Sequence, residues 1–444
     1  MTAPNWLTAR VDGMRGGDFG KLAVLMAAAF IDMVGGLMVF PLFPFYASKF
    51  GANGLEVGLL ITGFNVMQLV SAPLWGKVSD RYGRKPALLA GLIASAISYI
   101  IFAFANTYWL LLLCRLVQGA GGGTTGVIQA YVADAVEPKN RTRGLSWLSS
   151  ATNAGVVLGP LLGAQVILLG EHGPGLIAAL LCVINIWFAM KYLSEQRTAK
   201  ARAKSKVARS PWTVVFRVLT HPGEPASRLI WMYAICMGAF YGINPTLSLY
   251  LKDYWGVTAL TIGYFFTYIG LLNVLVRLLF VAPVVDRLGE IRAARLGTLL
   301  LALGVLLIPI VTPLHAPGLL AFLPLALVVV LIAFGTSFNF PATTGLLSRV
   351  VGENERGIYM GVQQTYAGVT RSIFPLYAGW AWDHYRAGWA WAHFRPIVPF
   401  GTAAAFIAAT TWLGFGLQKY SAHSEEAARQ DTAEEPAAIA SERR

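Results

Sequence analysis

Two residues of opposite charge, Asp32 and Arg115, fall inside long apolar stretches of the sequence. Ionisable side chains inside a membrane are costly and usually functional. At about 1.5 Å of rise per residue, Asp32 lies about 16 Å and Arg115 about 20 Å from the same edge of a membrane core, within reach of an arginine side chain. Because burial and a neighbouring charge act in opposite directions on a carboxyl group, this pair could bind and release a proton. A permanent structural ion pair is the alternative.

Two more arginines, Arg277 and Arg371, lie in later apolar stretches. Arg371 falls near mid-depth with no obvious acid in its own half of the chain, which predicts contact with an anionic or polar substrate group or hydrogen bonds to helix carbonyls. Arg277 lies nearer the end of its stretch, where it could pair with acids of the following loop. The apolar stretches thus contain one acid, Asp32, and three arginines. This excess of positive charge disfavours a dedicated transporter of dications.

Amide and phenol side chains within the apolar stretches could line a substrate cavity or join helices by hydrogen bonds. This group comprises Asn65, Gln68, Gln118, Tyr241, Asn244, Asn273, Asn339, Gln363 and Gln364. Because discontinuous helices often form binding sites, the Asn244-Pro245 pair predicts a break in its helix.

A short charged segment between two apolar stretches is the strongest local pattern, and it reads Gly76-Lys77-Val78-Ser79-Asp80-Arg81-Tyr82-Gly83-Arg84-Lys85. Asp80 could hold arginine side chains or cap the N-terminus of a neighbouring helix. Such a cluster could hold two helix bundles together and release them during a transport cycle. The alternative is topogenic positive charge alone.

Three glycines, Gly155, Gly159 and Gly163, recur every four residues and therefore share one helix face. Small residues on such a face allow another helix to approach to backbone contact. Pro160, which stands among them, predicts a bend. We expect a tight helix interface, with ordinary small-residue packing as the alternative.

The amino-acid composition indicates that these residues belong to a membrane protein. The 444 residues are 56% hydrophobic and 13% charged, whereas soluble domains average about 25% charged. Twelve apolar runs, each long enough for a membrane helix, fall at about 21–46, 55–76, 86–105, 107–134, 144–169, 174–193, 229–251, 258–284, 293–313, 317–348, 357–382 and 396–417. The predicted fold is an all-α membrane protein of twelve transmembrane helices in two pseudo-symmetric six-helix bundles.

Two similar halves are indicated by repeated patterns. Asp80-Arg81-Tyr82-Gly83 follows the second run and Asp286-Arg287-Leu288-Gly289 follows the eighth, and weak internal symmetry of this kind is found in repeat-built transporters. The predicted organisation is an N-terminal tail at 1–20, bundles at 21–193 and 229–418, a basic linker at 194–228 and a disordered C-terminal tail at 419–444.

The basic residues predict the orientation. Placing both termini in the cytoplasm puts most of the 35 Lys and Arg residues on that side and leaves Lys49, Lys252, Arg386 and Arg395 outside. The net charge of +13 is therefore interpreted as topogenic rather than as a nucleic-acid surface. The linker carries Arg197, Lys200, Arg202, Lys204, Lys206 and Arg209, which favours a solvated tether, with docking on anionic lipid as the alternative.

Several of these segments resemble motifs of the major facilitator superfamily. The loop from Gly76 to Lys85 is similar to its loop motif, Leu113-Cys114-Arg115-Leu116-Val117-Gln118-Gly119 to its arginine motif, and the segment from Gly155 to Gly163 to the antiporter motif of its drug:proton exporters. Phe30-Ile31-Asp32 with Pro41 and Pro44 resembles the first helix of twelve-helix exporters, tetracycline exporters included. Those exporters carry an acid in the third helix, where this sequence has Ser98.

The resemblance implies proton-coupled export of small amphipathic compounds by alternating access, with Asp32 and Arg115 in coupling. The alternatives are a carrier of organic anions or lipid-like substrates, a non-transporting sensor and a membrane enzyme; paired catalytic groups are not visible. We expect a monomer in the inner or plasma membrane that contacts lipid, substrate and protons. No metal, cofactor or nucleic acid is expected.

Overall fold

The computed structural model describes residues 16–122, 125–136, 141–193, 211–313, 318–352, 355–384 and 397–414. These residues form helices joined by short turns, and no strand occurs among them. Helices are expected because lipid offers no water to satisfy exposed backbone groups. Most of the predicted N-terminal tail, the basic segment of the linker and the predicted C-terminal tail lie outside the described residues.

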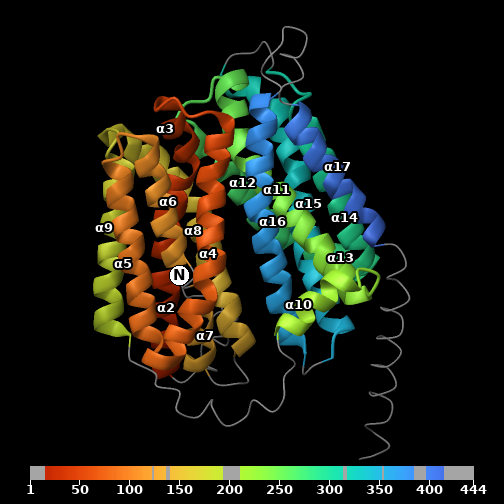
Figure 1. The fold of residues 1–444 in the computed structure, drawn as a ribbon, viewed down its shortest axis with the longest axis horizontal. Helices are drawn as coiled ribbons and strands as arrows, with labels where there is room; N and C mark the ends of the chain where they lie inside the picture. Colours follow the sequence, from red (N-terminus) through yellow and green to blue (C-terminus); the bar gives the residue numbers. More distant parts are fainter. Residues whose placement is uncertain are drawn as a thin grey trace, which may run out of the picture. The chain divides into compact units, whose positions relative to one another are not determined.

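The first compact unit comprises residues 1–204 and 245–271. Its helices are α2 (Gly16–Val39), η1 (Phe40–Leu42), α3 (Phe43–Lys49), α4 (Gly54–Tyr82), α5 (Arg84–Ala103), α6 (Tyr108–Gly122), α7 (Thr125–Ala135), α8 (Arg141–Val166), η3 (Ile167–Leu169) and α9 (Gly173–Tyr192). Within this unit α2 packs between α8 and α9, and α6 packs on α4 and α5 (Figure 1).

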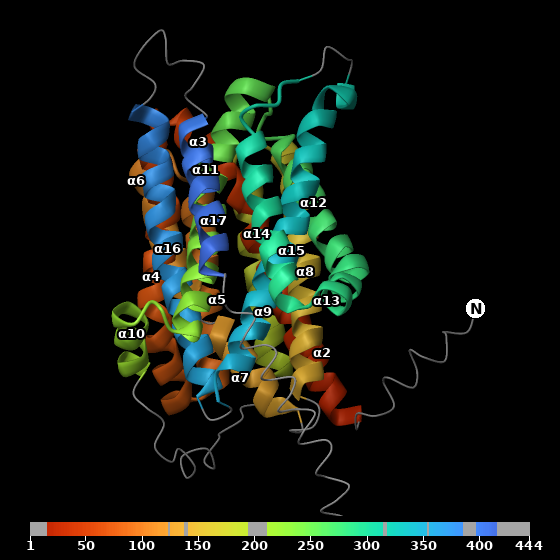
Figure 2. The same ribbon diagram turned by 90° about the vertical axis from the view of Figure 1, so that its right-hand side faces the viewer.

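The second unit comprises residues 205–244 and 272–444. Its elements are α10 (Pro211–Thr220), η5 (Arg277–Val281), α13 (Ala282–Leu288), α14 (Glu290–Leu307), η6 (Gly318–Phe322), α15 (Leu323–Val350), α16 (Arg356–His384) and α17 (Ile397–Leu413), whereas α11 (Pro225–Trp255) and α12 (Ile262–Val276) contribute residues to both units. In this unit α14 packs on α15 and α17 (Figure 2). The six-plus-six boundaries stay a prediction.

Eight helical segments in the described part of the chain are long and apolar enough to cross a membrane. They are Leu22–Lys49, Gly54–Tyr82, Arg84–Ala103, Arg143–Leu169, Gly173–Tyr192, Pro225–Trp255, Ile262–Leu288 and Leu320–Val350. The other predicted runs coincide with α6 and α7, α14, α16 and α17, which are shorter, more charged or less apolar. The chain is thus an all-α membrane protein, and the full count of twelve spans rests on those remaining helices.

The turns that follow α4 and α13 have the same backbone form. Gly83 has φ 108° and ψ 162°, Gly289 has φ 78° and ψ 158°, and each residue caps the next helix. A positive φ is readily adopted only by glycine. The two sequence copies therefore fold alike at the backbone.

Each unit has its own apolar core. In the first unit the core joins α2, α5, α7, α8 and α9, through buried residues that include Leu25, Leu92 and Val132. In the second it joins α10, α11, α15 and α16, through residues that include Val218, Leu347 and Val362. These cores fix the helices from which the candidate polar residues project.

Candidate functional site

Arg115 lies at the centre of a polar network in the first unit. The residue is 2% exposed on α6, and its Nη1 donates to Gln118 Oε1 while its Nε donates to Leu60 O at 3.4 Å. Its guanidinium also lies 4.3 Å from the ring centroid of Phe64 and 4.5 Å from that of Phe43. Aromatic faces attract a cation that has lost its water, so this arginine is held firmly without an acid.

Tyr99 extends the network toward α2. Gln118 Nε2 donates to the Tyr99 hydroxyl at 3.0 Å, and Tyr99 interacts electrostatically with Asp32. A Cβ built on Gly36 would lie 3.5 Å from that hydroxyl oxygen, so α2 approaches it closely. Tyr99 was not among the predicted residues, and its position beside Ser98 was the only signal for it in the sequence.

Asp32 itself is partly buried on α2. Within the described residues its carboxylate makes no hydrogen bond or ion pair, and its electrostatic neighbours are Tyr99 and Cys182. The direct ion pair with Arg115, considered from the matching depths, is not formed in this structure. Hydrogen bonds link Arg115 to Gln118 and Gln118 to Tyr99, whereas Asp32 interacts with Tyr99 only electrostatically.

The three regularly spaced glycines of α8 face the helix that carries Asp32. A Cβ on Gly155 would lie 2.8 Å from Met33 Cβ and 3.0 Å from Phe30 O, and a Cβ on Gly159 would lie 2.9 Å from Leu37 Cβ. A Cβ on Gly163 would collide with Met38 O. Any larger side chain must push α2 and α8 apart, so the predicted tight interface is present.

The other face of this α8 segment meets α12. A Cβ on Gly263 would collide with Pro160 O, and Gly270 lies against Val157. Pro160 lies inside α8 and has no N–H to give the carbonyl four residues earlier. The Gly-Pro segment is therefore packed between α2 and α12 within the first unit.

The charged segment from Gly76 to Lys85, predicted as a loop, instead comprises the last turns of α4, Gly83 and the first residues of α5. It forms ion pairs around Arg84. Arg84 Nη1 lies 2.9 Å from Asp80 Oδ1, and Arg84 Nε lies 3.2 Å from Asp134 Oδ2 on α7. Lys85 Nζ donates to Met190 O at 2.7 Å and to Leu193 O at 2.8 Å, at the end of α9. The segment thus ties α4, α5, α7 and α9 together.

The other residues of this segment, at the end of α4, differ in their surroundings. The Arg81 guanidinium lies 5.3 Å from the ring centroid of Tyr82, and a Cβ on Gly76 would meet nothing within 4 Å. Asp134 was not among the predicted residues, because its sequence neighbourhood carries no motif.

Two amides of the predicted cavity bind backbone carbonyls in the first unit. Asn65 Nδ2 donates to Ile61 O at 3.0 Å on its own helix. Gln68 Nε2 donates to Gly122 O at 3.2 Å, across to α6. Both side chains are only partly buried, so each keeps some accessible surface.

Arg371 lies on α16 in the second unit. Its Nε donates to Ala367 O at 3.3 Å, and its guanidinium lies 5.8 Å from the ring centroid of Tyr241. Tyr233, which interacts electrostatically with Arg371, accepts a hydrogen bond from Gln364 Nε2 at 3.3 Å. Tyr241 is 40% exposed. An arginine, two phenols and an amide are therefore connected by pairwise contacts, and Tyr241 among them is partly accessible.

Asn244 explains why α11 does not break at Pro245, contrary to the prediction. Pro245 cannot donate to the carbonyl of Tyr241, four residues earlier. Asn244 Nδ2 lies 3.4 Å from that oxygen and 3.2 Å from Phe240 O. The amide supplies a donor where the backbone has lost one, and α11 continues through the proline.

Three other predicted cavity residues join helices. Asn273 Oδ1 accepts from Thr336 at 2.8 Å, and the fully buried Asn339 donates to Thr298 at 2.6 Å. Gln363, also fully buried, accepts from Thr344 at 3.4 Å. These contacts link α12 to α15, α14 to α15 and α15 to α16, as the interhelical alternative predicts.

Arg277 lies exposed in the π-helical turn that follows α12, and it interacts electrostatically with Tyr233. Across the described residues, no group of three or more His, Cys, Asp or Glu side chains could hold a metal ion. The three cysteines, Cys114, Cys182 and Cys236, are buried thiols.

The chain is similar to known proteins over most of its length. The family model described as Major Facilitator Superfamily matches residues 25–375. The chain is 26% identical to the class B tetracycline resistance protein of Escherichia coli, over 81% of this chain and 88% of the relative. It is 25% identical to multidrug resistance protein 2 of Bacillus subtilis (strain 168), over 82% and 89%.

Solved structures share the fold. The human organic anion transporter MFSD10 (TETRAN) superposes with a TM-score of 0.63 at 23% identity, covering 90% of this chain and 100% of that one. The nucleoside transporter NupG superposes with a TM-score of 0.69 at 15% identity, covering 88% of this chain and 98% of that one.

Proposed function

The chain belongs to the major facilitator superfamily, and on this premise we propose that it exports small amphipathic compounds across a cell membrane in exchange for protons. It is a multi-pass membrane protein of a transporter family and not an enzyme. The proposal concerns the direction of transport, the coupling ion and the class of substrate.

The observation that carries the proposal is the position of Asp32. This carboxylate lies inside a membrane helix without a hydrogen bond or ion pair among the described residues, and it lies close to the Tyr99–Gln118–Arg115 network. A fixed cation nearby favours the ionised carboxylate, and loss of water favours the protonated one. A small shift of α2 changes the balance, so Asp32 can serve as the proton carrier.

The helix interface offers a means of shifting α2. Gly155, Gly159 and Gly163 bring α8 against the turns on both sides of Asp32. Movement of α8 during alternating access therefore moves the surroundings of the carboxylate directly. This arrangement supports coupling between helix motion and protonation.

The relatives support export as the direction. The names of the curated relatives refer to tetracycline resistance and to multidrug resistance, and removal of a drug from the cell is one route to resistance. We further propose that both termini and the linker are cytoplasmic, because most basic residues then lie on the side that basic loops favour.

A second candidate substrate class, organic anions, is favoured by Arg371. Its guanidinium faces Tyr241 at a partly accessible position, and a membrane-buried cation favours an anionic ligand. One structural neighbour is itself titled an organic anion transporter.

The test is a transport assay with the purified full chain in proteoliposomes. An imposed pH gradient should drive uphill movement of a lipophilic cation or a neutral amphipathic drug, and collapse of the gradient with a protonophore should stop it. If the pH gradient drove movement of an organic anion but of neither other probe, organic anions would be the substrate class. Binding of all three probes without any flux would contradict transport and indicate a sensor.

A further inference from the structure

The short helix α10 precedes the membrane helix α11 and presents three different surfaces. At 3.6 residues per turn, its side chains fall into three sectors. Val214 and Val218 are 2% and 0% exposed and face the protein. Trp212, Phe216 and Leu219 form an exposed apolar sector, and the exposed polar residues Thr213, Arg217 and Thr220 form a third.

The protein-facing sector holds α10 in place. Val214 and Val218 pack in a core cluster with Tyr359, Val362 and Tyr366 of α16. The Tyr366 hydroxyl donates to Val215 O at 2.9 Å, and Trp231 Nε1 of α11 donates to Val218 O at 3.4 Å. These contacts fix the rotation of α10 about its own axis.

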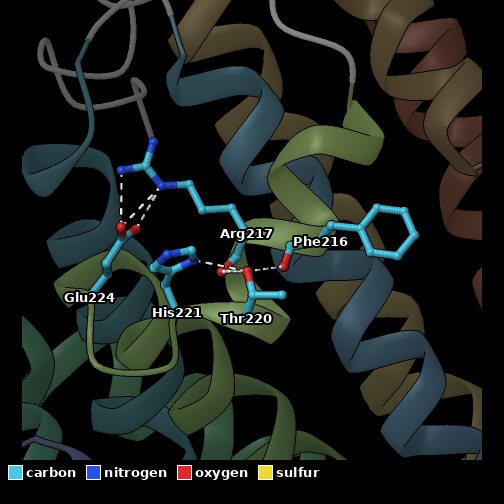
Figure 3. A network of polar contacts seen from close by, with 5 residues as sticks. All are labelled: Phe216, Arg217, Thr220, His221 and Glu224. Carbon is cyan, nitrogen blue, oxygen red and sulfur yellow. Dashed lines mark hydrogen bonds and ion pairs between the residues drawn. The ribbon is translucent and has the colours of Figure 1, made fainter.

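The turn after α10 adds a second attachment. Arg217 Nε lies 2.9 Å from Glu224 Oε2, and Thr220 Oγ1 lies 2.8 Å from His221 Nδ1. Figure 3 shows the Phe216 ring directed away from this network. The apolar sector is therefore held outward by contacts on the other sides of the helix.

Exposure of the apolar sector is large for a helix outside the spans. Trp212 is 70% exposed, Phe216 62% and Leu219 50%. With 10 residues, α10 is too short to cross a bilayer, which takes about 20. A rigid helix with one apolar and one polar open sector matches an amphipathic helix that lies in a membrane interface, where tryptophan is enriched.

We propose that the Trp212–Phe216–Leu219 sector inserts into the lipid leaflet on the side of the membrane where α11 begins. Only His221–Glu224 separates α10 from α11, and four residues span at most about 14 Å. The apolar sector is thus held near the membrane surface.

The test compares two labelled positions on the same helix. Phe216→Cys and Thr213→Cys each receive a fluorophore in the full chain, which is reconstituted in phosphatidylcholine nanodiscs. The three native thiols are buried, and labelling of the parent chain measures their reaction. Quenchers are a lipid with a nitroxide on its acyl chain and aqueous iodide.

We expect lipid quenching severalfold stronger at position 216 than at position 213, with iodide giving the opposite order. Equal iodide quenching at both positions would overturn insertion. Shielding of position 216 from both quenchers would overturn it as well and would indicate a surface covered by protein instead.

Discussion

The two units place different chemistry at the middle of their apolar helices. The first unit holds an acid, Asp32, near a network in which Arg115 is fully engaged with an amide, a carbonyl and aromatic rings. The second holds Arg371 beside Tyr241, a partly accessible phenol. A group that exchanges a proton and a group that attracts an anion need different surroundings. The contrast leads us to expect coupling in the first unit and substrate recognition in the second.

A second contrast lies in the turns at Gly83 and Gly289. The backbone is the same, but the residue that follows is Arg84 in one turn and Glu290 in the other. Arg84 pairs with Asp80 and Asp134, whereas Glu290 Oε1 lies 2.9 Å from Arg349 Nη2. The turn geometry is thus shared between the copies, while the sign of the charge next to it is reversed.

The largest effect should come from Asp32→Asn. This change keeps the shape of the side chain and removes the titrating proton, so pH-driven accumulation against a gradient should be lost while substrate binding partly survives. Uphill flux and equilibrium binding in proteoliposomes measure the two properties. Asp286→Asn, which alters an acid of the turn, is the control. Normal uphill transport by Asp32→Asn would show that Asp32 of the first unit does not couple transport to protons.

Arg371→Ala should affect recognition rather than coupling. Affinity for anionic compounds should fall by about 1–3 kcal/mol, the loss typical of a hydrogen bond to a charged group, while neutral compounds of similar size change little. Arg371→Lys should restore affinity only partly, because a point charge cannot replace a planar fork. Equal losses across cationic, neutral and anionic ligands in a binding assay would show that the second unit uses Arg371 structurally.

Gly163→Ala should destabilise the first unit and slow transport. Its new Cβ collides with Met38 O, and overpacking costs about 1–3 kcal/mol. Gly361→Ala on α16 is the matched control, because a Cβ there meets nothing within 4 Å. Thermal unfolding and initial transport rates should separate the two variants. If both alanines were tolerated equally, the tight α2–α8 interface would have no energetic role.

Loss of the acid near Gly83 and loss of the acid near Gly289 should change the free energy of unfolding by different amounts. The Asp80 side chain is 70% exposed and that of Glu290 18%. Asp80→Asn should therefore change unfolding free energy by less than about 1 kcal/mol, although transport per inserted molecule should fall. Glu290→Gln should cost about 1–3 kcal/mol because a less exposed charge loses its partner. A change in the amount inserted, with normal activity per molecule, would favour a topogenic role for Asp80.

The smallest effect concerns exposed ion pairs outside the membrane. Lys49 lowers the pKa of the Glu171 carboxyl, and Arg217 lowers the pKa of the Glu224 carboxyl. A lowered folded-state pKa stabilises the fold at neutral pH, and this contribution disappears as the pH falls through that value. Both effects should be small because the pairs are solvent-screened. Melting temperatures of Glu171→Gln and Glu224→Gln, measured from neutral to acidic pH, should show slightly flatter profiles than the parent.

Sequence reasoning predicted the all-helical membrane fold, because apolar length and backbone satisfaction determine it almost alone. The Gly155–Gly163 interface was also predictable, since spacing by four residues dictates a shared face. Tyr99 and Asp134 could not be found in the same way. Each acquires its role from a helix distant in sequence, and neither belongs to a periodic pattern or a motif.

The break expected at Pro245 shows a different limit. Proline removes a donor, and this loss is visible in sequence, but the compensation by the Asn244 side chain depends on its rotamer. The segment 211–228, predicted as part of a polar linker, in fact contains α10 and the start of α11. Val214 and Val218 share a helix face, but only the cluster around Tyr359 and Tyr366 shows that this face is buried.

The attachment of α10 has a mechanical consequence. Tension that arrives along the linker at Pro211 first reaches a helix bonded to α16 through Tyr366 and to α11 through Trp231. The load is shared between those two helices instead of acting at the first turn of α11 alone. A change in the length of the segment before Pro211 should therefore not displace the membrane-spanning helices. Insertions within residues 196–208 should leave transport intact.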